Sequence, residues 1–182
     1  MDLLEVYEKR RSVNFFEKGK EIPQDVLENI VNKAVLAPSA FNLQPWEIIV
    51  VKSKENKEKL CKLSNNQEKI LDGSLTLMIV GNKNGFATDS PVWDEMLVSL
   101  GGNKEAVAGA QGAAGFLYGS SEERKIKFAE SNAGLLGMSI MNMATYYGVD
   151  SHPMSGVDFE GIERDFELDE GKNLVMLIVL GY

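Results

Sequence analysis

The sequence predicts a layered domain of the α+β or α/β class, in which buried strands are separated by helices. Three runs, at 46–51, 75–80 and 174–180, are apolar almost throughout and rich in β-branched residues. Strands of this composition are usually covered on both faces of a sheet. Most of the chain between them has the apolar spacing of helices. No repeat, low-complexity tract or linker interrupts it, so residues 1–182 are expected to form one domain.

Helices are expected on both sides of the first strand. Residues 2–10 have the apolar spacing of a short helix. Pro23 suits the first turn of a second helix, whose apolar face reaches Val35. After the first strand, residues 54–63 are predicted to form a surface helix rich in charged side chains.

The segment between the second and third strands is predicted to be mostly helical. Residues 91–100 and 103–118 are expected to form two helices with glycine interruptions. In the second of them, small residues recur every three positions, a pattern that favours close packing: Gly109, Gly112 and Gly115.

A long helix is expected at 121–147, because Ser120 and Glu123 have capping-box spacing before it. Its second half, residues 133–144, is apolar almost all round, which is typical of a helix buried in a core or in a subunit interface. A last helix is predicted at 159–166.

Composition and charge argue against several classes of function. The net charge of −8 disfavours general nucleic-acid binding, which needs a basic face. No apolar run reaches the roughly 20 residues that span a membrane, and the acidic N-terminus lacks a signal-peptide pattern, so a cytoplasmic location is expected. The single Cys61 and the single His152 leave no internal disulfide and no recognisable metal motif. A nucleophilic Cys61–His152 pair has no support from the neighbouring residues.

Nucleotide-binding fingerprints are absent from the sequence. The segment from Gly81 to Gly85 follows a predicted strand but matches neither the dinucleotide-binding motif nor a phosphate-binding loop. A Rossmann-type domain is therefore not expected.

The first informative motif is Arg10-Arg11-Ser12, at the end of the first helix. Two guanidinium groups and a hydroxyl match the oxygens of a phosphate in geometry and charge. The alternative is a solvated basic turn, and the motif alone does not decide between the two.

The second motif is a polar loop, residues 38–46, which leads directly into the first strand. Three short polar side chains in it can bond the edge of a heterocycle or a ribityl chain: Ser39, Asn42 and Gln44. The alternative is an ordinary connecting loop. Two further segments, 66–72 and 152–156, are uninformative when each is taken alone.

Together and in this order, the four segments resemble the nitroreductase family of flavoproteins, from Arg10 to Tyr182. The resemblance implies an α+β fold, with a mixed central β-sheet flanked by helices, and a homodimer with two FMN sites at the subunit interface. It also implies an enzyme that takes hydride from NADH or NADPH at flavin N5. Electrons would then pass to a small-molecule acceptor, such as a nitroarene or a quinone, with ping-pong kinetics.

The resemblance assigns residues to both ends of the cofactor. Positions near the FMN phosphate and ribityl chain match Arg10, Arg11 and Ser12. The loop that the other subunit contributes matches Ser39, Asn42 and Gln44. In the same loop, Phe41 is a candidate for lining the acceptor pocket or, equally, for packing in the core.

The flavin ring is assigned two further segments. Asn66 matches the amide that faces the pyrimidine edge, and Lys69 matches the cation beside it. The segment behind the ring, whose backbone N–H groups can point at N5 and O4, matches Pro153, Met154, Ser155 and Gly156.

Two features depart from the family pattern. Asn14 stands where the family often has a basic residue, which removes a positive charge near the flavin. The sequence stops at Tyr182, where the family usually continues into a tail with basic phosphate contacts and a strand that pairs with the partner. We therefore expect FMN that dissociates readily, with binding that weakens as salt rises, and a dimer held by the long apolar helix.

Three alternatives to this enzyme stay open. One is a flavin-binding protein without turnover, which would act as a reservoir or a sensor. Another is a relative that uses the same site for dehalogenation, flavin breakdown or ring dehydrogenation. The last is a scaffold that binds no flavin. The sequence distinguishes neither NADH from NADPH nor one physiological acceptor from another.

Overall fold

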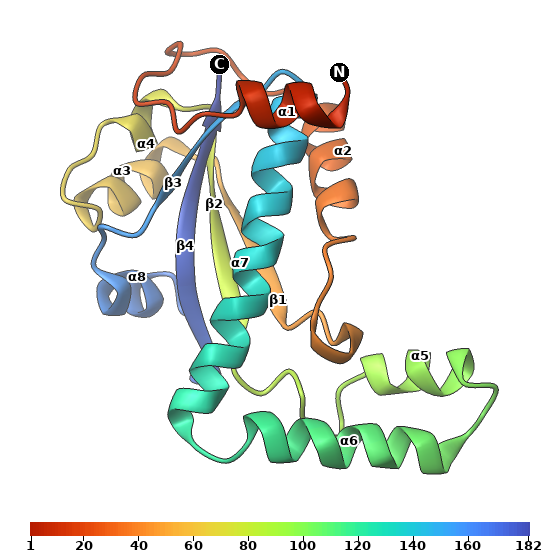
Figure 1. The fold of residues 1–182 in the computed structure, drawn as a ribbon. Coiled ribbons are helices and arrows are strands. Elements are labelled where there is room, and N and C mark those ends of the chain that lie inside the picture. Colours follow the sequence, from red (N-terminus) through yellow and green to blue (C-terminus); the bar gives the residue numbers. More distant parts are fainter.

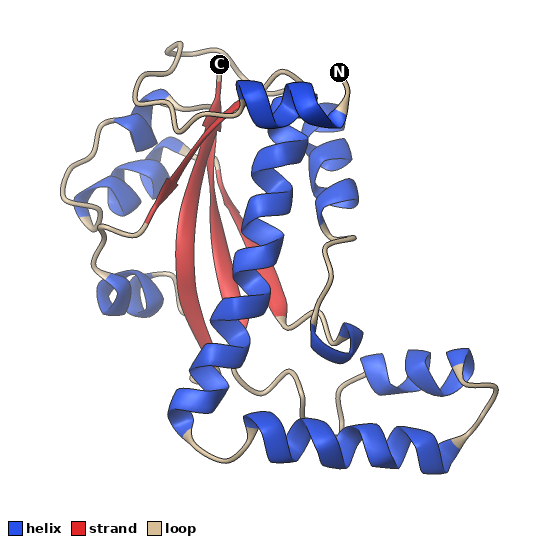
Figure 2. Cartoon of the chain, viewed as in Figure 1, coloured by secondary structure: helices blue, strands red, loops and turns tan.

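A four-stranded sheet forms the centre of the molecule, and the computed structural model describes it together with the rest of residues 1–182 (Figures 1 and 2). The strands, in the order β1-β2-β4-β3, are β1 (Trp46–Val51), β2 (Leu75–Asn82), β4 (Lys172–Gly181) and β3 (Asp150–Met154). All three strand pairs are antiparallel. The α+β class is confirmed. The predicted mixture of parallel and antiparallel strands is not seen within one chain. The parallel pairing there is one isolated bridge, between Ser12 and Ser151.

β3 is a strand that the apolar pattern does not predict, whereas the three predicted strands are confirmed. Its sequence is mostly polar, and Pro153 carries no N–H for a ladder. Pro153 is tolerated in β3 because this strand lies at the edge of the sheet, where it pairs only with β4.

Helices cover both faces of the sheet, which explains why the central strands are apolar on both sides. On one face, Leu77 and Ile178 belong to a core built with α2 and α7. On the other face, Met78 and Val179 belong to a core built with α3, α4 and α8. The five helices are α2 (Gln24–Ala34), α7 (Glu122–Tyr146), α3 (Lys54–Lys62), α4 (Lys69–Asp72) and α8 (Phe159–Asp165).

The long helix α7 crosses one face of the sheet (Figure 1). It begins after Ser121, whose hydroxyl accepts a hydrogen bond from the backbone N–H of Arg124. The predicted capping pair of Ser120 and Glu123 is therefore wrong by one residue, because Ser121 has the extended backbone that precedes the first turn. Only one side of α7 is buried, since Leu135 on its other side is 47% exposed.

Helices α5 (Val92–Ser99) and α6 (Lys104–Tyr118) form an arm that extends away from the sheet (Figure 1). A small apolar cluster joins the arm to the body: Leu43, Trp93, Val107, Ala114 and Phe128. The close packing predicted for the α6 glycines is wrong within one chain. A Cβ at any of them would meet no atom within 4 Å: Gly109, Gly112 and Gly115.

We expect Gly81→Ala to destabilise the fold by about 1–3 kcal/mol, the usual cost of overpacking a core. A Cβ at Gly81 in β2 would lie 2.9 Å from the Ala129 side chain of α7, so the helix would have to move away from the sheet. Urea unfolding measures the change. Gly109→Ala is the control, because open space and a helical backbone predict a gain of about 0.5–1 kcal/mol. Equal stability of the two variants would contradict the tight contact.

Candidate functional site

Three segments that are far apart in the sequence meet beside β3. The chain leaves α1 (Leu3–Lys9), and Ser12 then forms its bridge to Ser151. Next to this bridge, the backbone N–H of Val13 donates to the carbonyl of Ser151 at 3.1 Å. The first turn of α4 completes the cluster through Lys69. The structure therefore brings together three of the four predicted segments.

Lys69 is a cation held by neutral groups. Its Nζ donates to Oδ1 of Asn14 at 2.9 Å and lies 3.1 Å from Nε2 of His152. It belongs to none of the ion pairs of the chain. The side chain is only partly exposed, so its positive charge lies at a defined place with no carboxylate to neutralise it.

His152 is a site residue that sequence reasoning treats as an ordinary loop histidine. It lies in β3, and its Nδ1 is 2.6 Å from the carbonyl oxygen of Val13. Burial lowers the pKa of His152 below its usual 6.5; the Val13 hydrogen bond opposes this shift, and the Lys69 charge adds to it. Both ring nitrogens are thus engaged, and Cys61 is buried with its thiol donating to the carbonyl of Gln67. A Cys61–His152 nucleophile pair does not form.

The two predicted phosphate-binding arginines are free of carboxylates. Arg11 is exposed, and its Nη1 donates to the carbonyl of Arg10 at 2.8 Å. Neither arginine takes part in an ion pair, and Ser12 is exposed beside them. Most of the guanidinium donors therefore remain available to an anion.

The segment that follows β3 also offers free donors. Pro153 has no N–H to donate, and the side chain of Met154 points into the core. Ser155 and Gly156 are exposed, and their backbone N–H groups donate no hydrogen bond within the chain. Of the four residues predicted behind the ring, these two have the expected backbone donors.

Asn66 lies at the surface in a strained turn before α4. Asn65 and Asn66 both have left-handed backbone angles, with φ of 55° and 54°. The side chains of Asn65 and Gln67 donate to the carbonyl of Gly156 at 2.9 and 3.2 Å, which ties this turn to the segment after β3. The side chain of Asn66 forms no hydrogen bond within the chain and is exposed, so it is available to a ligand.

The fourth predicted segment is placed elsewhere, at the start of β1. Strand register separates the two places, because β1 begins opposite Gly81, which pairs with Asn173, whereas His152 pairs with Val179 further along β4. Six residues of strand correspond to about 20 Å. One chain therefore does not bring the loop at 38–46 to Lys69.

The loop at 38–46 is folded by unusual backbone angles. A short helix, η1 (Ala40–Asn42), contains Phe41 and Asn42, and with Gln44 these residues have φ between 46° and 55°. The hydroxyl of Ser39 accepts from the backbone N–H of Gln44 at 2.9 Å. The Phe41 ring lies 6.4 Å from the rings of both Trp93 and Tyr118, at the base of the arm. Asn42 is exposed.

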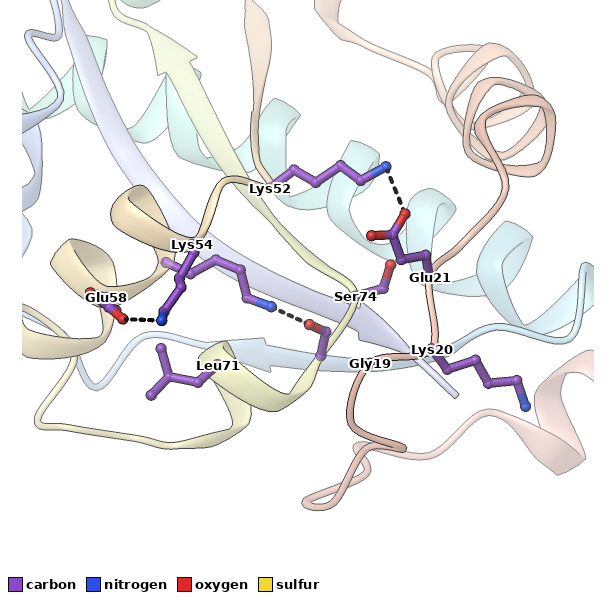
Figure 3. A pocket seen from close by; sticks show the side chains of 10 residues that line it. Gly19, Lys20, Glu21, Lys52, Lys54, Glu58, Leu71 and Ser74 are labelled. Atoms are coloured by element: carbon purple, nitrogen blue, oxygen red, sulfur yellow. Dashed lines mark hydrogen bonds and ion pairs between the residues drawn. The ribbon is translucent and has the colours of Figure 1, made fainter.

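A surface pocket of about 500 Å³ is lined by residues of α3, of the segment 19–21 and of the end of α4 (Figure 3). Its walls include four lysines, and each forms an ion pair or a hydrogen bond within the chain. Lys20 pairs with Glu17 at 2.8 Å. Lys52 pairs with Glu21 at 3.6 Å, and Lys54 pairs with Glu58 at 3.8 Å. Lys57 donates to the carbonyl of Gly73 at 2.5 Å. None of the predicted cofactor residues lines this pocket, so we assign it no role in the site.

Comparison with known proteins decides the family. The profile of the Nitroreductase family matches residues 7–182. The chain belongs to the nitroreductase family. A relative in Bacillus subtilis, MhqN, which bears the name of an NAD(P)H nitroreductase, is 31% identical over 174 residues, which cover 95% of this chain and 84% of MhqN.

Two further proteins similar to this chain bear names that concern their chemistry. The CLA biosynthesis enone reductase of Lactiplantibacillus plantarum is 29% identical over 184 residues, which cover 99% of this chain and 85% of the relative. A solved structure from Exiguobacterium sibiricum, described as a nitroreductase in complex with FMN, has a TM-score of 0.86 and 25% identity, and the match covers 100% of this chain and 88% of that one.

Two negative findings also describe this member of the family. No helix is both long enough and apolar enough to cross a membrane. No group of three or more histidine, cysteine, aspartate or glutamate side chains is arranged to hold a metal ion.

Proposed function

We propose that this chain is an FMN-dependent oxidoreductase that uses NADH or NADPH to reduce a small electron-poor acceptor. One observation carries the proposal: the cluster beside β3 holds several cationic and N–H donors that the chain itself leaves without anionic partners. The E. sibiricum family member, described in complex with FMN, supports the identity of the ligand.

The donors fit the two chemically distinct ends of FMN. Arg10, Arg11 and Ser12 would hold the phosphate, since one guanidinium group can donate two parallel hydrogen bonds to two oxygens of a phosphate. Lys69 would lie at the pyrimidine edge, and the N–H groups of Ser155 and Gly156 would face the central ring. FMN, when bound, supplies the hydride chemistry, so no side chain needs to act as a nucleophile.

We also propose a homodimer, because one chain builds only part of the site. The loop with Ser39, Asn42 and Gln44 lies about 20 Å along the sheet from the Lys69 cluster, as estimated from strand register. A second copy can present this loop to the first. An apolar surface is available for the contact, since Leu135 and Tyr146 on α7 are 47% and 46% exposed.

Leu135→Glu should weaken the dimer at least about thirtyfold, because burying a charge in an apolar interface costs about 2 kcal/mol or more. Sedimentation over a range of concentrations measures the change. Asn56→Glu is the matched control, since it adds the same carboxylate at an exposed position of α3, which covers the other face of the sheet from α7. A wild-type chain that sediments as a monomer, or equal behaviour of the two variants, would contradict an interface on α7.

The names of two relatives support two candidate classes of acceptor. MhqN bears the name of a nitroreductase, which favours a nitroarene or a related quinone. The L. plantarum relative bears the name of an enone reductase, which favours a conjugated enone. Both classes are flat and electron-poor, so each can take hydride from the same bound cofactor.

Reconstitution with FMN tests the proposed function. The purified chain is incubated with FMN and then with FAD, and the bound flavin is released and identified. The loaded protein is next reduced with NADH or NADPH without oxygen, and nitroarene, quinone and enone are compared as oxidants. Fast reduction by a nicotinamide, followed by reoxidation, supports the enzyme. Flavin that binds but is reduced slowly favours a reservoir or sensor, and a chain that binds no FMN overturns the proposal.

A further inference from the structure

We propose that His152 is a positioning residue, whose neutral ring holds the ammonium of Lys69 at the place where the pyrimidine end of FMN binds. The inference rests on the proposed function for the identity of the ligand. The contact itself, 3.1 Å between Nζ of Lys69 and Nε2 of His152, is a property of the chain alone.

The hydrogen bonds around the ring permit one protonation state. A lysine ammonium only donates, so Nε2 of His152 must carry the lone pair. The carbonyl of Val13, 2.6 Å from Nδ1, only accepts, so Nδ1 must carry the hydrogen. The neutral Nδ1–H tautomer satisfies both partners, and the other neutral tautomer satisfies neither.

The backbone fixes the ring in this orientation. Val13 is anchored because its N–H donates to the carbonyl of Ser151, next to His152 in β3. The strand is in turn paired with β4, where His152 lies opposite Val179. The acceptor that meets Lys69 therefore belongs to the sheet, whereas Lys69 belongs to the short helix α4.

A neutral acceptor has a physical advantage over a carboxylate at this place. The side chain of lysine is long and flexible, so fixing it in one place costs conformational entropy. A carboxylate would fix it but would also cancel its charge. His152 and Asn14 fix it with neutral atoms, so the full positive charge stays available to a ligand.

Protonation of His152 would break its hydrogen bond with Lys69. An Nε2–H group cannot accept from the ammonium, and two cations would then lie about 3 Å apart. The other ionisable groups on the packed segments are Arg10 and Arg11 after α1, Glu68 just before α4, Asp72 on α4, and Asp150 on β3. None of them hydrogen-bonds to the ring, and Asp72 is paired with Lys18 at 3.0 Å.

The sign of the pH effect follows from the lowered pKa of His152. The folded chain binds the proton less readily than the unfolded chain, whose histidine has its ordinary pKa near 6.5. The contact with Lys69 is therefore complete above that pH, and its contribution to stability is lost as the pH falls from 6.5 through the lowered value.

The first test uses the FMN-free chain, in which His152 is the only histidine. NMR of the ring nitrogens should report the Nδ1–H tautomer, and ring titration should give a pKa that rises in Lys69→Met, because a neighbouring cation has been removed. Lys62→Met, an exposed lysine on α3, should leave the titration unchanged. An Nε2–H tautomer, or equal titration in all three proteins, would overturn the contact.

The second test measures the midpoint potential of bound FMN at pH 8. His152→Leu removes the acceptor and should lower the potential by the larger part of the shift that Lys69→Ala produces. His152→Gln keeps an acceptor oxygen and should stay near the wild type. Adding His152→Leu to Lys69→Ala should lower the potential no further, because both changes remove one interaction.

The two tests separate this inference from the proposed function. A chain that binds no FMN overturns the function, while NMR still decides whether His152 holds Lys69. A normal potential in His152→Leu, combined with a lowered potential in Lys69→Ala, overturns the positioning role and leaves the function intact. If the leucine variant fails to fold, His152→Ala, which also removes the acceptor, replaces it in the potential measurement, and the titration of Lys69→Met still decides whether the contact exists.

Discussion

Arg10→Ala and Arg11→Ala should each weaken FMN binding by about 10- to 100-fold. A hydrogen bond to a charged group contributes roughly 1.5–3 kcal/mol, and about 1.4 kcal/mol corresponds to a factor of ten in affinity. Neither guanidinium group is paired with a carboxylate in the chain, so the phosphate would not compete with an existing partner. Titration of FMN-free protein, followed by the change in flavin fluorescence, measures the affinity.

Two comparisons make the arginine prediction specific to the phosphate. Riboflavin has the same ring without a phosphate, so both variants should bind it as the wild type does. Arg164→Ala is the matched control, since Arg164 is an exposed arginine on α8 that contacts Asp165. Equal losses for FMN and riboflavin would mean that the arginines support the fold or the ring, and no loss for FMN would place the phosphate elsewhere.

Added salt should weaken the contact between the two arginines and the FMN phosphate, as the arginine substitutions do. Arg11 is exposed, and exposed charges are screened over about 8 Å at physiological ionic strength. FMN affinity in the wild type should therefore fall as salt rises, and it should fall less in the arginine variants. An affinity that does not depend on salt would mean that buried groups hold the phosphate.

The parts of the fold that could be predicted from the sequence are those with a strong local pattern. β1, β2 and β4 are apolar almost throughout, and such runs are visible without any tertiary information. In the two central strands, β2 and β4, this composition matches a sheet that is covered on both faces. β3 has no such pattern. Its pairing depends on β4 and on the segment after α1, so it exists only in the folded chain.

The residues of the candidate site also divide into those that could be predicted from the sequence and those that could not. Arg10 and Arg11 could be named because they lie in a contiguous motif of recognisable composition, whereas Lys69 could be named only through the resemblance to the family. His152 could not be assigned a role, because its two partners are 83 and 139 residues away in the sequence. A lone histidine in a polar segment gives no local signal of such contacts. The role of Asn14 also appears only in the folded chain. Its side chain has no charge, but it accepts a hydrogen bond from Lys69.

Lys69→Ala should make bound FMN harder to reduce, with a drop of roughly 30–60 mV in its midpoint potential. Reduction adds negative charge to the ring, so a nearby cation stabilises the reduced form more than the oxidised form. Such a contact contributes about 1.5–3 kcal/mol, and about 30 mV corresponds to 1.4 kcal/mol for a two-electron couple. We expect the upper end of this range, because Lys69 forms no ion pair in the chain and Asn14 adds no second positive charge. Equilibration with a reference dye under anaerobic conditions measures the potential.

Two further variants separate the charge of Lys69 from its other contributions. Lys69→Arg keeps a positive charge at the same position and should recover most of the potential, although its planar group cannot reproduce both contacts of the ammonium. Lys62→Ala, which removes an exposed lysine of α3, should leave the potential unchanged. A higher potential in Lys69→Ala would mean that the lysine favours the oxidised form. An unchanged potential would place Lys69 away from the ring, and the His152 contact would then serve the fold alone.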